Sequence, residues 1–243
     1  MDPLRTDQYA TTSSLNARRR LHLDFSTADM PWHEWVFDHI SLRDGTRVLE
    51  VGAGMGDLWA RNRDRIPAAT IEATDQPAGM VKAGRCATEG LPITWTVSAA
   101  AETGFDDQSF DLVIANHMLY HVPGAAKTTA EIRRMLKPGG VLVAATNGVR
   151  HMAELNGLLT KRPRPLPFTL ENGSEMLVTS FSAVERRDFQ DSLHVTDADP
   201  AVAYLESYNE LRDPESIRAH VQDVIGKNGF FHVTKAVGLF LAS

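Results

Sequence analysis

Five short, β-rich runs alternate with helix-compatible segments through the middle of the chain, and this alternation constrains the fold most strongly. The segments compatible with helices span 56–66, 78–89 and 125–136. Strands that alternate with helices at this interval predict a mostly parallel sheet, doubly wound with helices on both faces. The runs are RVLEV (47–51), TIEAT (70–74), ITWTV (93–97), FDLVIAN (110–116) and GVLVAAT (140–146).

Both ends of the chain depart from this alternation. The N-terminal part predicts helices over 14–25, started by Ser13 or Ser14, and within 30–42. In the last third, Asn172 followed three residues later by Glu175 resembles a capping box. Beyond it we expect a strand in AVERRDF, helices over 198–212 and 214–226 (the second opened by Asp213 and Pro214), a helical insertion over 190–228 and a final edge strand or hairpin-like pair in GFFHVTKAVGLFLA.

Charge, cysteine content and hydropathy exclude several classes of protein. The net charge of −6 disfavours a nucleic-acid partner, because proteins that bind polyanions usually carry a basic footprint. The one cysteine, Cys86, permits no internal disulfide and no cysteine-rich metal site. The polar start of the chain indicates no signal peptide, and no apolar run approaches the length of a membrane span. We therefore expect a cytoplasmic protein without a membrane or nucleic-acid partner.

A glycine-rich loop follows the first run, in VLEVGAGMGDL (48–58). Glycines after a strand let the backbone turn sharply into a helix and approach a nucleotide closely. Dinucleotide sites use the spacing G-x-G-x-x-G, whereas here Gly52, Gly54 and Gly56 are spaced at every second position. Glu50, two residues before the first glycine, would repel a pyrophosphate but suits a ligand with a cationic amine and a sulfonium.

Taken in order, these motifs resemble those of class I S-adenosylmethionine (SAM)-dependent methyltransferases of the small-molecule type, over nearly the whole chain. VLEVGAGMG is similar to the glycine-rich first motif of that family. ATDQPAGMVKAGR resembles the second, in which an acidic residue ends the second strand and a methionine follows five residues later. FDDQSFDLVIANHMLYHV, followed by EIRRMLKPGGVLVAAT, resembles the fourth and fifth strands and the helix between them.

The resemblance implies an α/β fold of about seven strands, the last one antiparallel, in a single domain that binds SAM and releases S-adenosylhomocysteine. Within that domain it implies an N-terminal helical lid over 1–40, a SAM-binding core over 41–149, and acceptor-side helices and final strands over 150–243. Asp75 lies 19 residues after Gly56, where a carboxylate can accept both ribose hydroxyls. The implied cofactor-binding residues are Tyr9, Glu50, Gly52, Ala53, Gly54, Gly56, Asp75, Gln76, Met80, Ala100, Ala101 and Asn116.

One position departs from the family pattern. The family often has an acidic residue after its third strand that accepts the adenine amino group, and here the matching position is Ala99. Adenine would then depend on backbone groups of Ala100 and Ala101 and on packing against Met80. The alternative roles are a strand-end turn for Asp75, a backbone cap for Glu50 and core packing for Met80. The tryptophans Trp32, Trp35 and Trp59 are interpreted as packing residues.

Residues after the fourth and fifth strands should face the reacting methyl group, because ligands of open α/β sheets bind beyond the carboxyl ends of the strands. If NHMLYHV begins a helix, His117 and His121 lie one turn apart and one of them can take a proton from the acceptor. Tyr9 would close over the methionine end of the cofactor. The expected catalytic residues are His117, His121 and Tyr9, and the expected substrate-binding residues are His117, Tyr120, Asn147 and His151.

The predicted reaction is methyl transfer to an oxygen or nitrogen atom of a small molecule, such as a specialised metabolite. No metal is expected, because His117 and His121 have no evident third ligand. Two alternatives stay open at this point: a SAM-binding protein that shapes a cyclisation without transferring a methyl group, and a methyltransferase acting on protein or RNA. The motifs do not determine the oligomeric state.

Overall fold

The computed structural model describes residues 12–122, 124–159, 164–207 and 213–243, in two compact units. The sheet unit comprises Met30–Gly148, Leu166–Phe189 and Val237–Ser243. The second unit comprises Met1–Asp29, Val149–Pro165 and Gln190–Ala236. Tyr9 falls outside the described residues.

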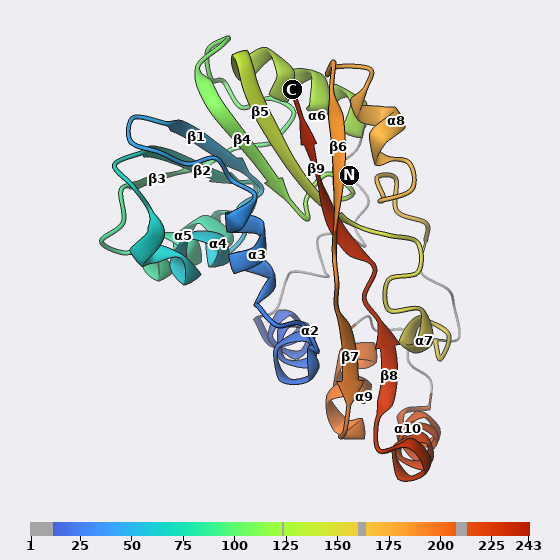
Figure 1. Ribbon diagram of the computed structural model, residues 1–243. Coiled ribbons are helices and arrows are strands. Elements are labelled where there is room, and N and C mark those ends of the chain that lie inside the picture. Colours follow the sequence, from blue (N-terminus) through green and yellow to red (C-terminus); the bar gives the residue numbers. More distant parts are fainter. Residues whose placement is uncertain (1–11, 123, 160–163, 208–212) are drawn as a thin grey trace. The chain divides into compact units, whose positions relative to one another are not determined.

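The sheet unit contains a seven-stranded sheet with the order β3-β2-β1-β4-β5-β9-β6 (Figure 1). Neighbours from β3 through β5 run parallel, and β9 is antiparallel to both β5 and β6. This is the predicted mostly parallel sheet with an antiparallel last strand. The strands are β1 (Arg47–Val51), β2 (Thr70–Asp75), β3 (Ile93–Val97), β4 (Phe110–Asn116), β5 (Leu136–Asn147), β6 (Val184–Phe189) and β9 (Val237–Ala242).

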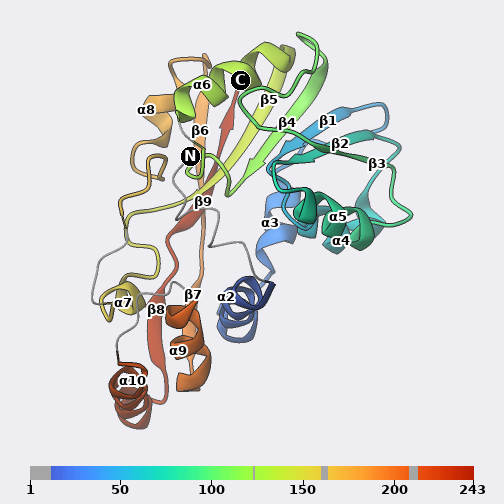
Figure 2. The ribbon, with the colours of Figure 1, turned by 180° about the vertical axis from the view of Figure 1, so that it is seen from behind.

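Helices cover both faces of this sheet because the central strands are apolar on both sides. Alternate residues of β4 divide between two clusters: Leu112 and Ile114 pack on one face, Val113 and Ala115 on the other. Figure 2 shows the same unit from behind. The first face carries α3 (Trp32–Asp38) and α4 (Asp57–Arg61), the second carries α6 (Ala125–Met135) and α8 (Gly173–Leu177), and α5 (Ala78–Ala87) packs on Ala73 and Trp95.

Four local expectations are corrected. The strand β9 is not an edge strand, because it lies between β5 and β6 and hydrogen-bonds to both. The other half of the expected hairpin-like pair, β8 (Phe231–Thr234), pairs instead with β7 (Ser192–Val195). The helix expected over 56–66 divides into α4 and a short 3-10 helix, η1 (Arg63–Arg65). The capping box at α8 does not form, because the Asn172 side chain accepts a hydrogen bond from the backbone N–H of Thr169 at 2.7 Å instead.

The second unit packs helices around the β7–β8 ribbon with an apolar core of its own. Its longest helix starts as its sequence predicts, since the Asp213 carboxylate accepts a hydrogen bond from the backbone N–H of Ser216 and Pro214 takes the first position. The segment 190–228, predicted as a helical insertion, contains the strand β7 in addition to helices. The helices of this unit are α2 (Thr12–Phe25), α7 (Ala153–Asn156), α9 (Ala198–Glu206) and α10 (Pro214–Asn228).

Candidate functional site

The glycine loop joins β1 to α4, and its three glycines all adopt left-handed backbone conformations. A Cβ atom on Gly52 would lie 2.7 Å from the Cβ of Met118, and one on Gly56 would lie 2.9 Å from the Trp95 ring. A larger residue at either position would therefore clash with its neighbours and would also be strained by the left-handed backbone. Gly54 differs, because nothing lies within 4 Å of its added Cβ. The backbone at Gly54 thus faces open space, as a surface that binds a ligand should.

Asp75, the last residue of β2, is hydrogen-bonded to this loop. Its Oδ2 accepts the backbone N–H of Gly54 and its Oδ1 that of Gln76, each at 2.7 Å. Burial raises the pKa of Asp75, and the two backbone hydrogen bonds oppose that rise. Each carboxylate oxygen has a second lone pair, so the group can still accept hydroxyls.

Glu50 lies beneath the loop, inside the core. Its side chain is buried, and Oε2 accepts a hydrogen bond from the indole Nε1 of Trp59 at 2.6 Å. Burial raises the pKa of Glu50 to about 8, an effect that nearby Asp75 and Asp57 increase and the Trp59 hydrogen bond decreases. The interpretation of Trp59 as a packing residue agrees with its complete burial. Its indole also donates a hydrogen bond to the Glu50 carboxyl group, which is buried beneath the loop.

The segment after β3 starts beside Asp75, because the backbone N–H of Ser98 donates to the Asp75 carbonyl at 3.0 Å. Ala99 pairs with Glu102 in an isolated bridge that closes a tight turn. Ala100 is buried in this turn, whereas Ala101 and Met80 are half-buried. The acidic residue in the turn is Glu102, and Lys127 binds its carboxylate at 2.7 Å.

Asn116 ends β4 and His117 follows it, at the carboxyl edge of the sheet. The Asn116 Oδ1 accepts a hydrogen bond from the indole Nε1 of Trp32 at 3.3 Å. His117 has a φ of 55°, and its backbone N–H donates to the carbonyl of Ala145 on β5 at 3.1 Å. A left-handed residue cannot continue into an α-helix, so the chain turns here instead.

NHMLYHV (116–122) therefore does not begin a helix, and the condition that would place both histidines on one helix face is not met. Met118 to His121 form a turn closed by the hydrogen bond from His121 N to the Met118 carbonyl at 2.9 Å. Tyr120 contacts both histidines, with ring centroids 6.1 Å from His117 and 4.4 Å from His121. Of the pair, His117 is the one that contacts Trp32, at 5.0 Å between ring centroids.

Aromatic side chains gather around Trp32, which contacts each of the others, and we call this group the aromatic wall: Trp32, Trp35, His117 and Phe189. The Phe189 ring lies 5.3 Å from Trp32 and 5.2 Å from Trp35 between centroids. Phe189 ends β6, so it comes to the same edge as Asn116 from the far side of the sheet. Trp32 and Trp35 are half-buried rather than core residues. In the sequence, two tryptophans before the first strand are only a weak indication of a site. The structure connects them to it, because Trp32 contacts His117 and Phe189.

Asn147, His151 and Tyr9 are the other predicted acceptor-side residues. Asn147 ends β5, where its carbonyl accepts the backbone N–H of Leu170 at 3.1 Å. His151 belongs to the second unit, half-buried, with its ring nearly parallel to that of His22 at 6.0 Å. Tyr9 lies outside the described residues.

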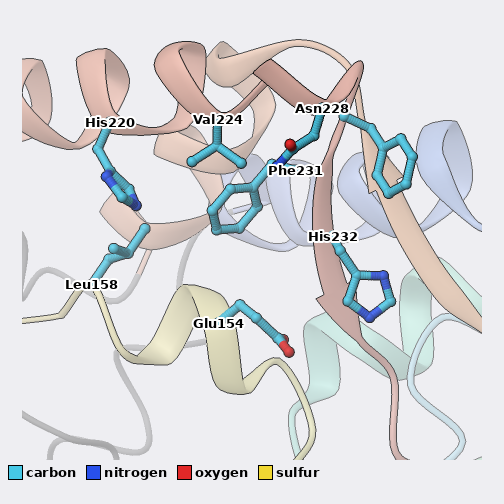
Figure 3. Close-up of a pocket in the computed structure, with 8 residues that line it drawn as sticks. Glu154, Leu158, His220, Val224, Asn228, Phe231 and His232 are labelled. Carbon is cyan, nitrogen blue, oxygen red and sulfur yellow. The ribbon is translucent and has the colours of Figure 1, made fainter. Parts of the chain in front are cut away.

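Two concavities are lined by other residues. One, of about 580 Å³, lies at the opposite edge of the sheet, between Asp44, Lys137 and Ser243. The other, of about 480 Å³, lies in the second unit, where Leu158, Val224 and Phe231 form an apolar floor (Figure 3). Its acidic residue, Glu154, is engaged, because its carboxylate accepts both the N–H and the hydroxyl of Thr234 at 2.7 Å.

No cluster of three or more His, Cys, Asp or Glu side chains in the described part of the chain could hold a metal ion. None of the described helices is both long and apolar enough to cross a bilayer.

Comparison with known proteins gives a family match and curated relatives. Residues 49–144 match the family model described as a methyltransferase domain. The chain is 32% identical over 116 residues to the ubiquinone/menaquinone biosynthesis C-methyltransferase UbiE of Paracoccus denitrificans, a match that covers 46% of either protein. The chain thus spans about half the length of that relative.

Solved structures share the fold over more of the chain. A putative methyltransferase of Bacillus halodurans superposes with a TM-score of 0.63 at 14% identity, covering 87% of this chain and 97% of that one. Phosphoethanolamine N-methyltransferase 2 of Haemonchus contortus, in complex with phosphomonomethylethanolamine and S-adenosylhomocysteine, gives 0.64 at 18% identity, covering 100% of this chain and 60% of that one. Residues 49–144, which include the glycine loop and Asp75, thus match a methyltransferase domain, and the superpositions show that the chain shares the fold of these methyltransferases.

Proposed function

We propose that this protein transfers the methyl group of SAM to a small hydroxylated aromatic acceptor, at a ring carbon. The aromatic wall is the observation that supports this class of acceptor. It lies beside Asn116, at the edge of the sheet to which the methyl group of a donor bound to the glycine loop would extend. Ligands of open α/β sheets occupy this edge. A planar ring that stacks on Trp32 and Phe189 gains apolar burial and the favourable geometry of aromatic pairs.

The residues of the loop fit SAM in three respects. Gly54 faces open space, so its backbone admits a ligand closely. Asp75 is held with free lone pairs at the end of β2, where it can accept two vicinal hydroxyls. The acidic groups around the loop, Glu50, Asp57 and Asp75, favour a cation over a pyrophosphate. When bound, SAM supplies a methyl group on a sulfonium, which is a good leaving group.

The chain's own contribution is to orient the acceptor and remove its proton. Asn116 keeps its amide N–H groups for the acceptor, since its Oδ1 accepts from Trp32. His117, next to it, can take the hydroxyl proton as a general base. The resulting phenolate is nucleophilic at its oxygen and at the adjacent ring carbon, so one proton transfer serves either outcome. After attack by carbon, loss of the ring proton restores the aromatic system.

Which atom reacts then depends on how the wall orients the ring. The relatives named as C-methyltransferases support carbon, in place of the oxygen or nitrogen expected from the sequence. Oxygen methylation is the nearest alternative, because it uses the same acceptor and the same base.

The test supplies SAM labelled with ¹³C at its methyl group to mono- and dihydroxylated benzenes and naphthalenes, to phosphoethanolamine, and to RNA and protein pools. Mass spectrometry identifies methylated products, and NMR shows whether the labelled methyl is bonded to a ring carbon or to oxygen. Label on a ring carbon is the expected result. Label only in amines, RNA or protein contradicts the proposal. Bound SAM with no labelled product in any pool would favour the non-methylating cyclase.

A further inference from the structure

Glu50 is a buried carboxyl group without a counter-charge. It is 2% exposed, and its hydrogen-bond partner, the Trp59 indole, is neutral. Among the described residues no lysine, arginine or histidine forms an ion pair with it. The charged groups that face it, Asp75 from β2 and Asp57 from the start of α4, are themselves acidic.

An isolated charge in such surroundings is costly, and a buried group usually neutralises itself instead. For a carboxyl group this means holding a proton. The Trp59 N–H opposes this, because it stabilises the ionised form, but burial outweighs it and raises the pKa of Glu50 to about 8. Without a ligand, therefore, Glu50 is neutral at neutral pH.

The proposed methyl donor would change this balance. SAM carries a sulfonium, an ammonium and a carboxylate, so its net charge is positive, whereas S-adenosylhomocysteine has lost the sulfonium charge. Glu50 lies in β1, two residues before Gly52 of the loop, and Asp75, its acidic neighbour, is hydrogen-bonded to Gly54. A donor on this loop brings the missing positive charge toward Glu50.

We propose that Glu50 releases its proton to solvent when SAM binds and regains one when S-adenosylhomocysteine takes its place, so that this residue distinguishes donor from product by charge. The inference rests on the proposed function only for the identity of the donor. Protons and charge balance over one catalytic cycle, because methyl transfer converts the sulfonium to a thioether and frees the acceptor's proton. One proton equivalent then returns Glu50 to its neutral form.

Titration calorimetry at about pH 7 tests this directly. SAM is titrated into the whole protein in phosphate and in Tris, whose ionisation enthalpies differ, and the difference in observed heat gives the protons released. About one proton per SAM is expected, and a smaller number for S-adenosylhomocysteine. In Glu50→Gln, which keeps an acceptor for Trp59, the release should vanish. The SAM affinity of the unaltered protein should rise about tenfold per pH unit up to about pH 8, relative to Glu50→Gln.

A second variant keeps the test independent of Glu50 itself. Trp59→Phe removes the hydrogen bond that stabilises the ionised carboxylate, so proton release should persist to higher pH than in the unaltered protein. Asp111→Asn, at the opposite edge of the sheet, is the matched control and should release as many protons as the unaltered protein.

Several results overturn the inference while SAM still binds: no proton release, equal release in Glu50→Gln, or equal release for donor and product. Failure of the acceptor assignment is a separate outcome, since it leaves the proton release intact and appears only as missing methylated product.

Discussion

The two halves of the carboxyl edge of the sheet are built from different parts of the chain. At the β1–β2 half, backbone groups define the site: left-handed glycines and the N–H groups that hold Asp75. At the β4–β6 half, side chains define it, since the Trp32 ring contacts those of His117 and Phe189. Backbone geometry changes little on substitution, whereas a wall of side chains changes with each one. The first half is suited to one constant donor, and the second can be altered to suit a particular acceptor.

If the two halves are separable in this way, a substitution in one should leave the ligand of the other unaffected. The predictions below test this separation.

The largest effect is expected from His117→Asn, in the acceptor half. Asparagine tolerates the left-handed φ of 55° better than most residues, yet it cannot accept a proton at neutral pH. Turnover should fall by about 10²–10⁴-fold, the usual loss of a general base, while the SAM dissociation constant stays unchanged. Steady-state kinetics and calorimetry measure the two. The parallel variant His121→Asn, which lies beyond Tyr120, should lose less. Wild-type turnover in His117→Asn would show that transfer proceeds without this base.

The next effect belongs to the donor half and concerns stability. Because the pKa of Glu50 is raised to about 8, the folded state holds a proton that the unfolded state releases above its ordinary carboxyl pKa. The favourable contribution is therefore fully present at acidic pH and is lost as pH rises toward about 8. Chemical denaturation should show unfolding free energy falling by about 2–4 kcal/mol over that range, relative to Glu50→Gln. Parallel pH profiles for both proteins would mean that Glu50 is ionised in the fold.

Asp75→Ala should weaken SAM binding by about 1–3 kcal/mol, since it leaves the N–H groups of Gly54 and Gln76 without their acceptor. Asp75→Asn retains one carbonyl oxygen and should lose less. Calorimetry measures the SAM dissociation constants of both variants, with Asp111→Asn as a distant control. Acceptor KM should remain the same in each variant at saturating SAM. A shifted acceptor KM would show that the two halves are coupled.

The sequence predicted the donor half because its signals are local. Each strand of the parallel sheet is a short β-rich run, and the spacing from Gly54 to Asp75 lies within one strand–helix–strand unit. The position of β9 inside the sheet could not be predicted, because strand order depends on pairing between distant segments. A strand that reads as terminal in the chain is not terminal in space.

The acceptor half was predicted less well for the same reason. His117 was found from its place after β4, but its left-handed backbone, which ends the expected helix, has no signature in NHMLYHV. Trp32 and Phe189 meet only through the fold, from either end of the sheet unit. Glu50 shows an intermediate case: its position was predicted from the motif, whereas its burial against Trp59 depends on how α4 packs.

The smallest effect should come from the aromatic wall itself, and it tests the comparison most finely. Trp32→Phe keeps a ring against Phe189 but removes the Nε1 donor to Asn116, while Trp32→Leu removes both. Stacking of an aromatic pair contributes about 0.5–1.5 kcal/mol beyond its area burial, so acceptor KM should rise by about 3- to 10-fold in Trp32→Leu. If the wall recognises a planar ring, Trp32→Phe restores most of this loss for hydroxynaphthalenes, and neither variant changes the SAM dissociation constant. Equal losses in both variants would assign the effect to the Trp32–Asn116 hydrogen bond, and the wall would then orient Asn116 rather than contact the acceptor.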